Sequence, residues 1–242
     1  MHNEVNINDV VLGEVMKVYA VLHGQTELDV EKRIQGISDD PLCDAGREQA
    51  HALANMLSDK GIDMIISSPQ VRAMETAQII AGKLELDKSK IVNGVKFTER
   101  CFGEHEGKHF DEVDFFAIVS WSRNSAVVDG ETIRELAERV ILYINNMVRL
   151  FRTKTMLLVV PNNVLEVLFW FFGGLPDAGQ EKIPEYAHDT IYEFETDDIP
   201  AEMKDFMTVL DKIKAEETGE AGSSSRLLSQ SEIDALIAEI SG

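Results

Sequence analysis

Residues 18–24 read VYAVLHG, an apolar run that ends in His23 and Gly24. A short apolar run without polar alternation predicts a strand that is buried on both faces. Residues 64–67 (MIIS) and 155–160 (TMLLVV) have the same character, and residues 190–195 predict a last strand. Helical patterns lie between these runs. The order predicts an α/β fold, a three-layer α/β/α sandwich with a mostly parallel sheet.

The helical patterns have recognisable boundaries. Residues 44–60 predict an amphipathic helix that ends at Gly61, with four inward positions: Ala50, Leu53, Met56 and Leu57. Ser68-Pro69 predicts the start of a second helix, with Ser68 as N-cap and Pro69 at the first helical position. Residues 132–151 and 164–172 predict two more helices.

Composition limits the classes of partner. The net charge of −20 would repel nucleic acid and anionic membrane surfaces, so neither is expected as a partner. A phosphate ester would be repelled too, unless local cations overcame the global field. Two cysteines without paired spacing, Cys43 and Cys101, together with a polar start at residues 1–9, favour a reducing, cytoplasmic location. No cofactor and no metal site is predicted.

Ligands of parallel α/β sheets bind beyond the carboxyl ends of the strands. Residues 23–50, at the first of these ends, read HGQTELDVEKRIQGISDDPLCDAGREQA. Residues 67–77 read SSPQVRAMETA, residues 99–108 read ERCFGEHEGK, and residues 129–140 read DGETIRELAERV. In this order and at these spacings, the segments resemble the histidine phosphatase (phosphoglycerate mutase-like) family, over about residues 17–196.

The resemblance implies a particular chemistry. In the family, a neutral imidazole attacks phosphorus and forms a phosphohistidine, cations hold the phosphoryl oxygens, and a carboxylic acid protonates the leaving oxygen. The matching positions make His23 the nucleophile and Glu99 the acid. The candidate phosphate-binding residues are Arg72, Gly24, Arg33 and Asn162.

Two positions depart from the family pattern. The family has an arginine before its nucleophile and a second histidine after a later strand, whereas this chain has Leu22 and Pro161 there. A shifted register does not restore either cation, because no arginine precedes Arg33 and no histidine lies between His109 and His188. Each lost donor costs on the order of 10²–10³ in rate.

We therefore expect a degenerate, catalytically impaired domain that binds a phosphorylated ligand or acts as an adaptor. The alternative is an active phosphomonoesterase that forms a phosphohistidine at His23. A third possibility is a scaffold whose pocket no longer binds phosphate.

Residues 105–109, HEGKH, match the H-E-x-x-H pattern of zinc proteases. That motif requires a helix, which Gly107 disfavours at its centre. A loop without zinc is the preferred interpretation.

The ends of the chain predict separate elements. Residues 1–16 form an N-terminal extension, residues 17–196 the phosphatase-like domain, and residues 197–225 an acidic helix and flexible linker. Residues 226–242 predict a docking helix, with a capping box at Ser229 and Glu232. Its apolar stripe comprises Ile233, Leu236, Ile237 and Ile240, and Leu228 before the cap forms a hydrophobic staple with Ile233. The alternative is that this helix packs on its own domain.

The wording LSQSEIDALI within this tail resembles the CheY-binding peptide of flagellar motor switch proteins such as FliM and FliY. The resemblance implies a phosphorylated CheY-type response regulator as partner.

Overall fold

The computed structural model describes residues 16–120, 123–174 and 186–195. Within them, five strands form one sheet of order β3-β2-β4-β1-β5. The strands are β1 (Lys17–Leu22), β2 (Met64–Ser67), β3 (Ile91–Asn93), β4 (Met156–Val160) and β5 (Tyr192–Glu195). The first four pair in parallel, and β5 pairs with β1 in the antiparallel direction. The predicted mostly parallel sheet is confirmed.

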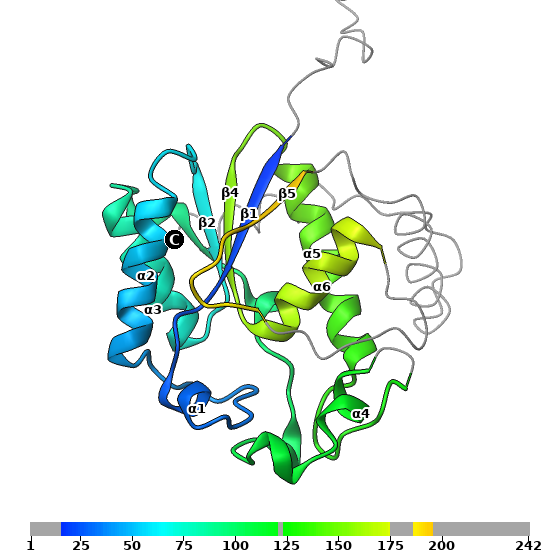
Figure 1. The fold of residues 1–242 in the computed structure, drawn as a ribbon. Coiled ribbons are helices and arrows are strands. Elements are labelled where there is room, and N and C mark those ends of the chain that lie inside the picture. The colour runs from blue at the N-terminus through cyan, green and yellow to red at the C-terminus, as the bar shows by residue number, and fades with distance from the viewer. Residues whose placement is uncertain (1–15, 121–122, 175–185, 196–242) are drawn as a thin grey trace, which may run out of the picture.

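Helices cover both faces of this sheet (Figure 1). α2 (Asp44–Met56) and α3 (Val71–Lys83) lie together on one face, and α5 (Ile133–Leu150) and α6 (Asn162–Gly173) lie together on the other. The short helices α1 (Glu27–Val30) and α4 (Phe115–Val119) lie near the carboxyl end of the sheet. Four 3-10 turns complete the described elements: η2 (Lys88–Lys90), η3 (Val95–Phe97), η4 (Gly103–His105) and η5 (Phe110–Glu112).

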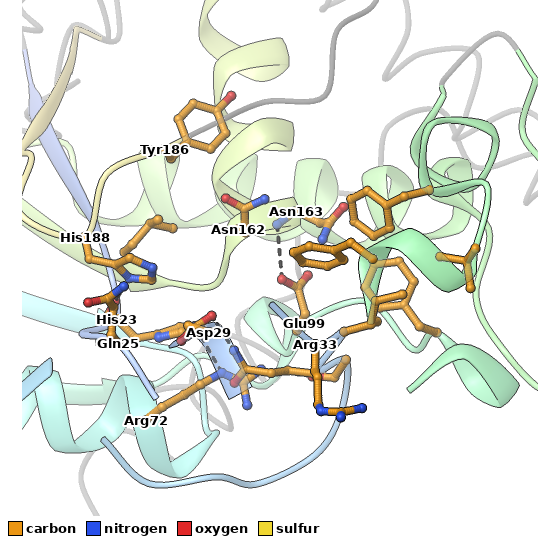
Figure 2. A pocket seen from close by; sticks show the side chains of 18 of the residues that line it. His23, Gln25, Asp29, Arg33, Arg72, Glu99, Asn162, Asn163, Tyr186 and His188 are labelled. Atoms are coloured by element: carbon orange, nitrogen blue, oxygen red, sulfur yellow. Dashed lines mark hydrogen bonds between the residues drawn. The ribbon is translucent and has the colours of Figure 1, made fainter. Parts of the chain in front are cut away.

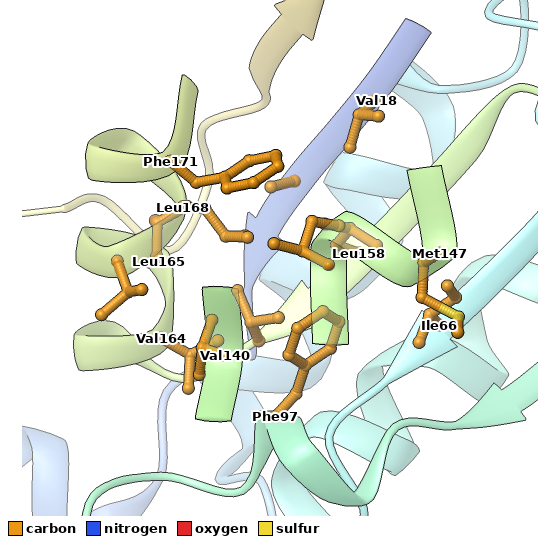
Figure 3. Close-up of a cluster of buried hydrophobic side chains, with 14 of the residues drawn as sticks. Val18, Ile66, Phe97, Val140, Met147, Leu158, Val164, Leu165, Leu168 and Phe171 are labelled. Carbon is orange, nitrogen blue, oxygen red and sulfur yellow. The ribbon is translucent and has the colours of Figure 1, made fainter. Parts of the chain in front are cut away.

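The central strands have an apolar core on each side. All five residues of β4 are buried because helices cover both of its faces, which explains its unbroken apolar run. Figure 3 shows one core, in which Leu168 and Phe171 of α6 and Val140 of α5 pack toward Val18 and Leu158 of the sheet. This rigid centre fixes the strand ends that carry the candidate site.

The start of α3 differs from the prediction. Gln70, not Ser68, is the N-cap of α3. The reason is that the Ser68 N–H still donates to Val159 O, at 2.9 Å, and therefore continues the strand pairing. Asp39 accepts the N–H of Val71 and so supplies a side-chain cap from another loop. Met56, predicted to face inward, is 50% exposed, because it lies off the buried face of α2, which includes Ala50, Leu53 and Ala54.

The segment HEGKH is not a helix. Its first residue ends η4 and Gly107 has a φ of 79°, so the two imidazoles do not share a helix face. No helix among the described residues is long and apolar enough to cross a membrane. The N-terminal extension up to residue 15, the predicted linker at 197–225 and the predicted docking helix at 226–242 lie outside the described residues.

Candidate active site

A cavity of about 610 Å³ opens at the carboxyl ends of β1 and β4. His23, Arg72, Glu99, Asn162 and His188 line it, and Figure 2 shows their side chains. They come from segments far apart in the sequence, which the parallel sheet brings to one edge. Four of the five were predicted as site residues, and His188 was not.

His23 follows directly on β1 and is 4% exposed. Its Nδ1 lies 2.8 Å from Gly24 O, and since a carbonyl only accepts, Nδ1 carries the proton. Nε2 is then the unprotonated nitrogen. Burial, together with the charge of Arg72, lowers the pKa of His23 from 6.5 to about 3. His23 is therefore a neutral imidazole with one fixed tautomer, as a nucleophile requires.

Arg72, in the first turn of α3, makes the direct contact with that nitrogen. Its Nε–H donates to His23 Nε2 at 3.1 Å. Its two terminal nitrogens donate to Ser38 O at 2.6 Å and to Gly36 O at 2.9 Å. A guanidinium has five N–H groups, so two remain for a ligand. Burial lowers the pKa of Arg72 but leaves it a cation.

Gly24 makes a close backbone contact, and its role in phosphate binding stays a prediction. Its N–H already donates to Thr76 Oγ1 at 3.0 Å. A Cβ on Gly24 would lie 2.2 Å from Gly46 O, and a Cβ on Gly46 would lie 2.1 Å from Gln25 O. The loop after β1 and helix α2 therefore touch backbone to backbone, which only glycine permits.

Glu99 is 5% exposed and accepts two backbone hydrogen bonds. Arg100 N–H donates to Oε1 at 2.8 Å, and Asn163 N–H donates to Oε2 at 3.2 Å from the start of α6. Burial raises the pKa of Glu99, and the two N–H donors only partly oppose this. A buried carboxyl group with a raised pKa is suited to donate a proton.

His188 is the residue that sequence reasoning missed. Its Nδ1 donates to His23 O at 2.6 Å, and the two imidazole centroids lie 5.6 Å apart. Because Nδ1 is occupied, Nε2 is the ring nitrogen left for the cavity. The segment is held on both sides. Tyr186 stacks on Phe169 and donates to Glu166 on α6, and β5 pairs with β1.

The other predicted positions have mixed outcomes. Leu22 is buried at the end of β1 and supplies no charge, and Pro161 is the N-cap of α6. Arg33 lines the cavity across from His23 (Figure 2), but its guanidinium pairs with Glu31 at 2.8 Å and donates to Gly107 O. Asn162 lines the cavity at the first position of α6.

The cavity also contains an unexpected carboxylate. Asp29 lines it and is bound by Thr26, through both its N–H and its hydroxyl, and by the amide of Gln35. Its negative charge opposes that of Arg72 and acts to raise the pKa of His23. The capping box of α1 fixes it, since Thr26 and Asp29 are the N-cap and the third residue of that helix.

Comparison with known proteins gives a consistent answer. The family model described as histidine phosphatase superfamily (branch 1) matches residues 18–204. A probable phosphoglycerate mutase, GpmB, of Enterobacter sp. (strain 638) is 31% identical over 175 residues, which cover 70% of this chain and 80% of that protein.

Two solved structures are similar in fold to this chain. Bacillus stearothermophilus YhfR superposes with a TM-score of 0.64 at 26% identity, over 74% of this chain and 90% of that one. A phosphoserine phosphatase mutant of Entamoeba histolytica in complex with phosphoserine gives 0.57 at 26% identity, over 64% and 78%.

Proposed function

This chain belongs to the histidine phosphatase superfamily, branch 1, and we propose that it is a phosphomonoesterase that transfers a phosphoryl group to His23 and then to water. The observation that carries the proposal is the state of His23. Its imidazole is buried, neutral and fixed as the Nδ1–H tautomer, with Nε2 3.1 Å from a guanidinium N–H. A buried structural histidine would also need a donor at its basic nitrogen, but here the pair of His23 and Arg72 lines a cavity together with Glu99.

The first step forms a bond between His23 Nε2 and phosphorus and breaks the ester bond. Arg72 Nε–H now donates to Nε2, so incoming phosphoryl oxygens must compete for that N–H before the lone pair attacks. The two remaining N–H groups of Arg72 can hold equatorial oxygens. In this step Glu99 gives its proton to the leaving oxygen. In the second step it takes one from the attacking water, whose oxygen bonds to phosphorus as the bond to His23 Nε2 breaks and phosphate leaves.

His188 supplies part of what Leu22 and Pro161 do not. It lies beside His23 on a segment that is fixed at both ends, and its Nε2 is left for the cavity. Since Nδ1 carries the proton of the neutral ring, Nε2 donates to a phosphoryl oxygen only as part of an imidazolium, in which both ring nitrogens are protonated. The site then has two donors, Arg72 and His188, in place of the family's larger set. We therefore expect turnover that is real but slower than that of a complete site.

The test is hydrolysis of p-nitrophenyl phosphate by the full chain, compared with His23→Ala. We expect phosphate release that the variant abolishes. A matched control is His51→Ala, which changes an exposed histidine on α2 and should be silent. Equal rates in His23→Ala and the unchanged protein would refute the role of His23.

A second candidate is a binder that does not turn over. The observation in its favour is that three N–H groups of Arg72 are already donated, two of them to backbone carbonyls. This candidate predicts vanadate or phosphate binding without hydrolysis. Measured turnover that depends on His23 would exclude it.

We also propose a protein partner, on the basis of the C-terminal sequence. Residues 226–242 would dock a phosphorylated CheY-type regulator as an amphipathic helix, through Leu228 and the stripe of Ile233, Leu236, Ile237 and Ile240. The test is binding of a 226–242 peptide to the activated and the inactive regulator, with Leu236→Asp as control. Equal affinity for both forms would contradict the proposal.

A reducing, cytoplasmic location belongs to the same proposal. In the described structure, Cys43 and Cys101 are both unpaired, as expected where thiols stay reduced.

A further inference from the structure

The cavity is much larger than a phosphoryl group needs, and its two ends differ in chemistry. One end holds His23, Arg72 and Glu99. The other end has an apolar and aromatic wall that consists of Phe102 and, from the segment around η5 and α4, Phe110, Val113, Phe115 and Phe116. Polar side chains, among them Gln25 and Asn163, line the space between the two ends. A volume of about 610 Å³ is that of a site for a whole small molecule.

The rings of this second end form a connected surface. Phe110 and Phe115 have centroids 4.8 Å apart, and Phe102 and Phe115 have centroids 6.0 Å apart. Phe102 is buried and supports the layer, whereas Phe110 is 40% exposed although it lines the cavity. An exposed phenyl ring at a cavity wall gains by burying apolar surface of a ligand.

The charges at the same end disfavour an anion. Four carboxylates line the whole cavity, Asp29, Glu99, Asp111 and Asp114, against two arginines. Asp111 and Asp114 belong to the aromatic end, and their side chains are 92% and 72% exposed. Arg123 lies 3.7 Å from Asp114 and partly offsets its charge. The two arginines of the lining do not, because Arg33 pairs with Glu31 and Arg72 lies at the phosphoryl end.

From these observations we infer that the substrate is a phosphate monoester of an uncharged or cationic aromatic alcohol, and not of an anionic one such as glycerate. The inference rests on the proposed function, since it assumes that the phosphoryl group lies at His23. The ring of the leaving group would lie against Phe110 and Phe115, with Asp111 and Asp114 rejecting a second anionic group.

Three phosphonates test this without any need for turnover. Methylphosphonate carries the head group alone, benzylphosphonate adds a phenyl ring, and 2-carboxyethylphosphonate adds a carboxylate. Titration of the full chain should show benzylphosphonate binding about 10- to 100-fold more tightly than methylphosphonate, as expected for burying one ring. 2-Carboxyethylphosphonate should bind no more tightly than methylphosphonate.

Variants assign the effect to the aromatic end. Phe110→Ala should remove most of the advantage of benzylphosphonate and leave methylphosphonate affinity unchanged. Phe115→Leu, which keeps apolar volume, should reduce it less. Met56→Ala, on the exposed end of α2, is the control and should change neither affinity. Asp111→Asn with Asp114→Asn should improve binding of 2-carboxyethylphosphonate, and Asn at 114 retains the helix cap.

The outcomes separate the two proposals. Equal affinity for benzylphosphonate and methylphosphonate, or tightest binding of the carboxylate, would overturn the inference about the substrate and leave the phosphoryl site standing. An advantage of benzylphosphonate that survives in Phe110→Ala and in Phe115→Leu would also overturn it. Failure of all three ligands to bind would overturn both proposals.

Discussion

Removing the His188 imidazole should slow phosphoryl transfer without unfolding the protein. His188 contributes one hydrogen bond to the fold, from Nδ1 to His23 O, and its other ring nitrogen is left for the cavity. Loss of one preorganised donor to a phosphoryl oxygen costs on the order of 10²–10³ in rate. We therefore expect His188→Ala to lower kcat/KM for p-nitrophenyl phosphate by about that factor.

A conservative variant distinguishes donation from packing. His188→Gln places an amide that can still donate one hydrogen bond, so it should retain more activity than His188→Ala. Thermal unfolding should change little, since a net hydrogen bond contributes about 1 kcal/mol. The controls are His51→Ala and the melting temperature of each variant.

The result that would refute the reasoning is a His188→Ala enzyme within about threefold of the unchanged protein in kcat/KM, which is far less than one donor contributes. If the loss of kcat/KM in His188→Ala and His188→Gln instead parallels the drop in their melting temperatures, His188 only positions His23.

The remaining predictions concern single groups. The pKa of His23 is about 3 in the folded protein, whereas an ordinary histidine has a pKa of 6.5, so the unfolded chain binds the extra proton between these values. Stability should fall with falling pH by about 1.4 kcal/mol per unit from this group, and His23→Gln should flatten that slope in urea titrations from pH 6 to pH 4.5. Glu99→Gln should lower kcat/KM for alkyl phosphates by roughly 10²–10⁴ but kcat/KM for p-nitrophenyl phosphate far less, since kcat/KM reports the transfer to His23 and nitrophenolate leaves without a proton; equal losses of kcat/KM for both esters would contradict an acid role. Gly46→Ala should cost about 1–3 kcal/mol because its Cβ would lie 2.1 Å from Gln25 O, whereas Gly82→Ala, with nothing within 4 Å, should stabilise by up to about 1 kcal/mol. A Gly46→Ala protein as stable in urea as Gly82→Ala would disprove the close contact.

Much of the fold was predictable because local signals agree with the global arrangement. The apolar runs at residues 18–22, 64–67 and 155–160 correspond to β1, β2 and β4, whose two covered faces require unbroken apolar sequence. Capping chemistry fixed Thr132 as the start of α5. The start of α3 was mispredicted because Ser68 continues the sheet pairing, a tertiary contact that no local signal reports.

The site was predictable where it follows a strand end in sequence. His23, Arg72 and Glu99 come together as expected. His188 was missed because it precedes a strand instead of following one. β5 runs antiparallel to β1, so the beginning of β5 lies at the carboxyl end of β1. The sequence predicted the strand at residues 190–195 but not that it runs antiparallel to β1. Without that direction, nothing in the sequence places His188 beside His23.

Contacts that involve backbone groups also could not be predicted from the sequence. Gly24 was expected to bind phosphate, and its N–H donates to Thr76 Oγ1. Arg33 was expected near the phosphate, but Glu31 and a carbonyl hold its guanidinium. The sequence shows which residue types could bind phosphate. Whether their N–H groups are free for a ligand depends on nearby acceptors in the folded protein, which the sequence does not show.

The most direct test of the central claim is detection of phosphohistidine on His23 itself. The full chain is mixed with a ³²P-labelled aryl phosphate, quenched in base within the first turnover, and the labelled residue is identified by peptide mapping. The account predicts label at His23 that appears and decays at least as fast as phosphate is released, and that is absent from His23→Ala. Phosphate release at the same rate with no label on His23, or with label that persists in His23→Ala, would contradict it.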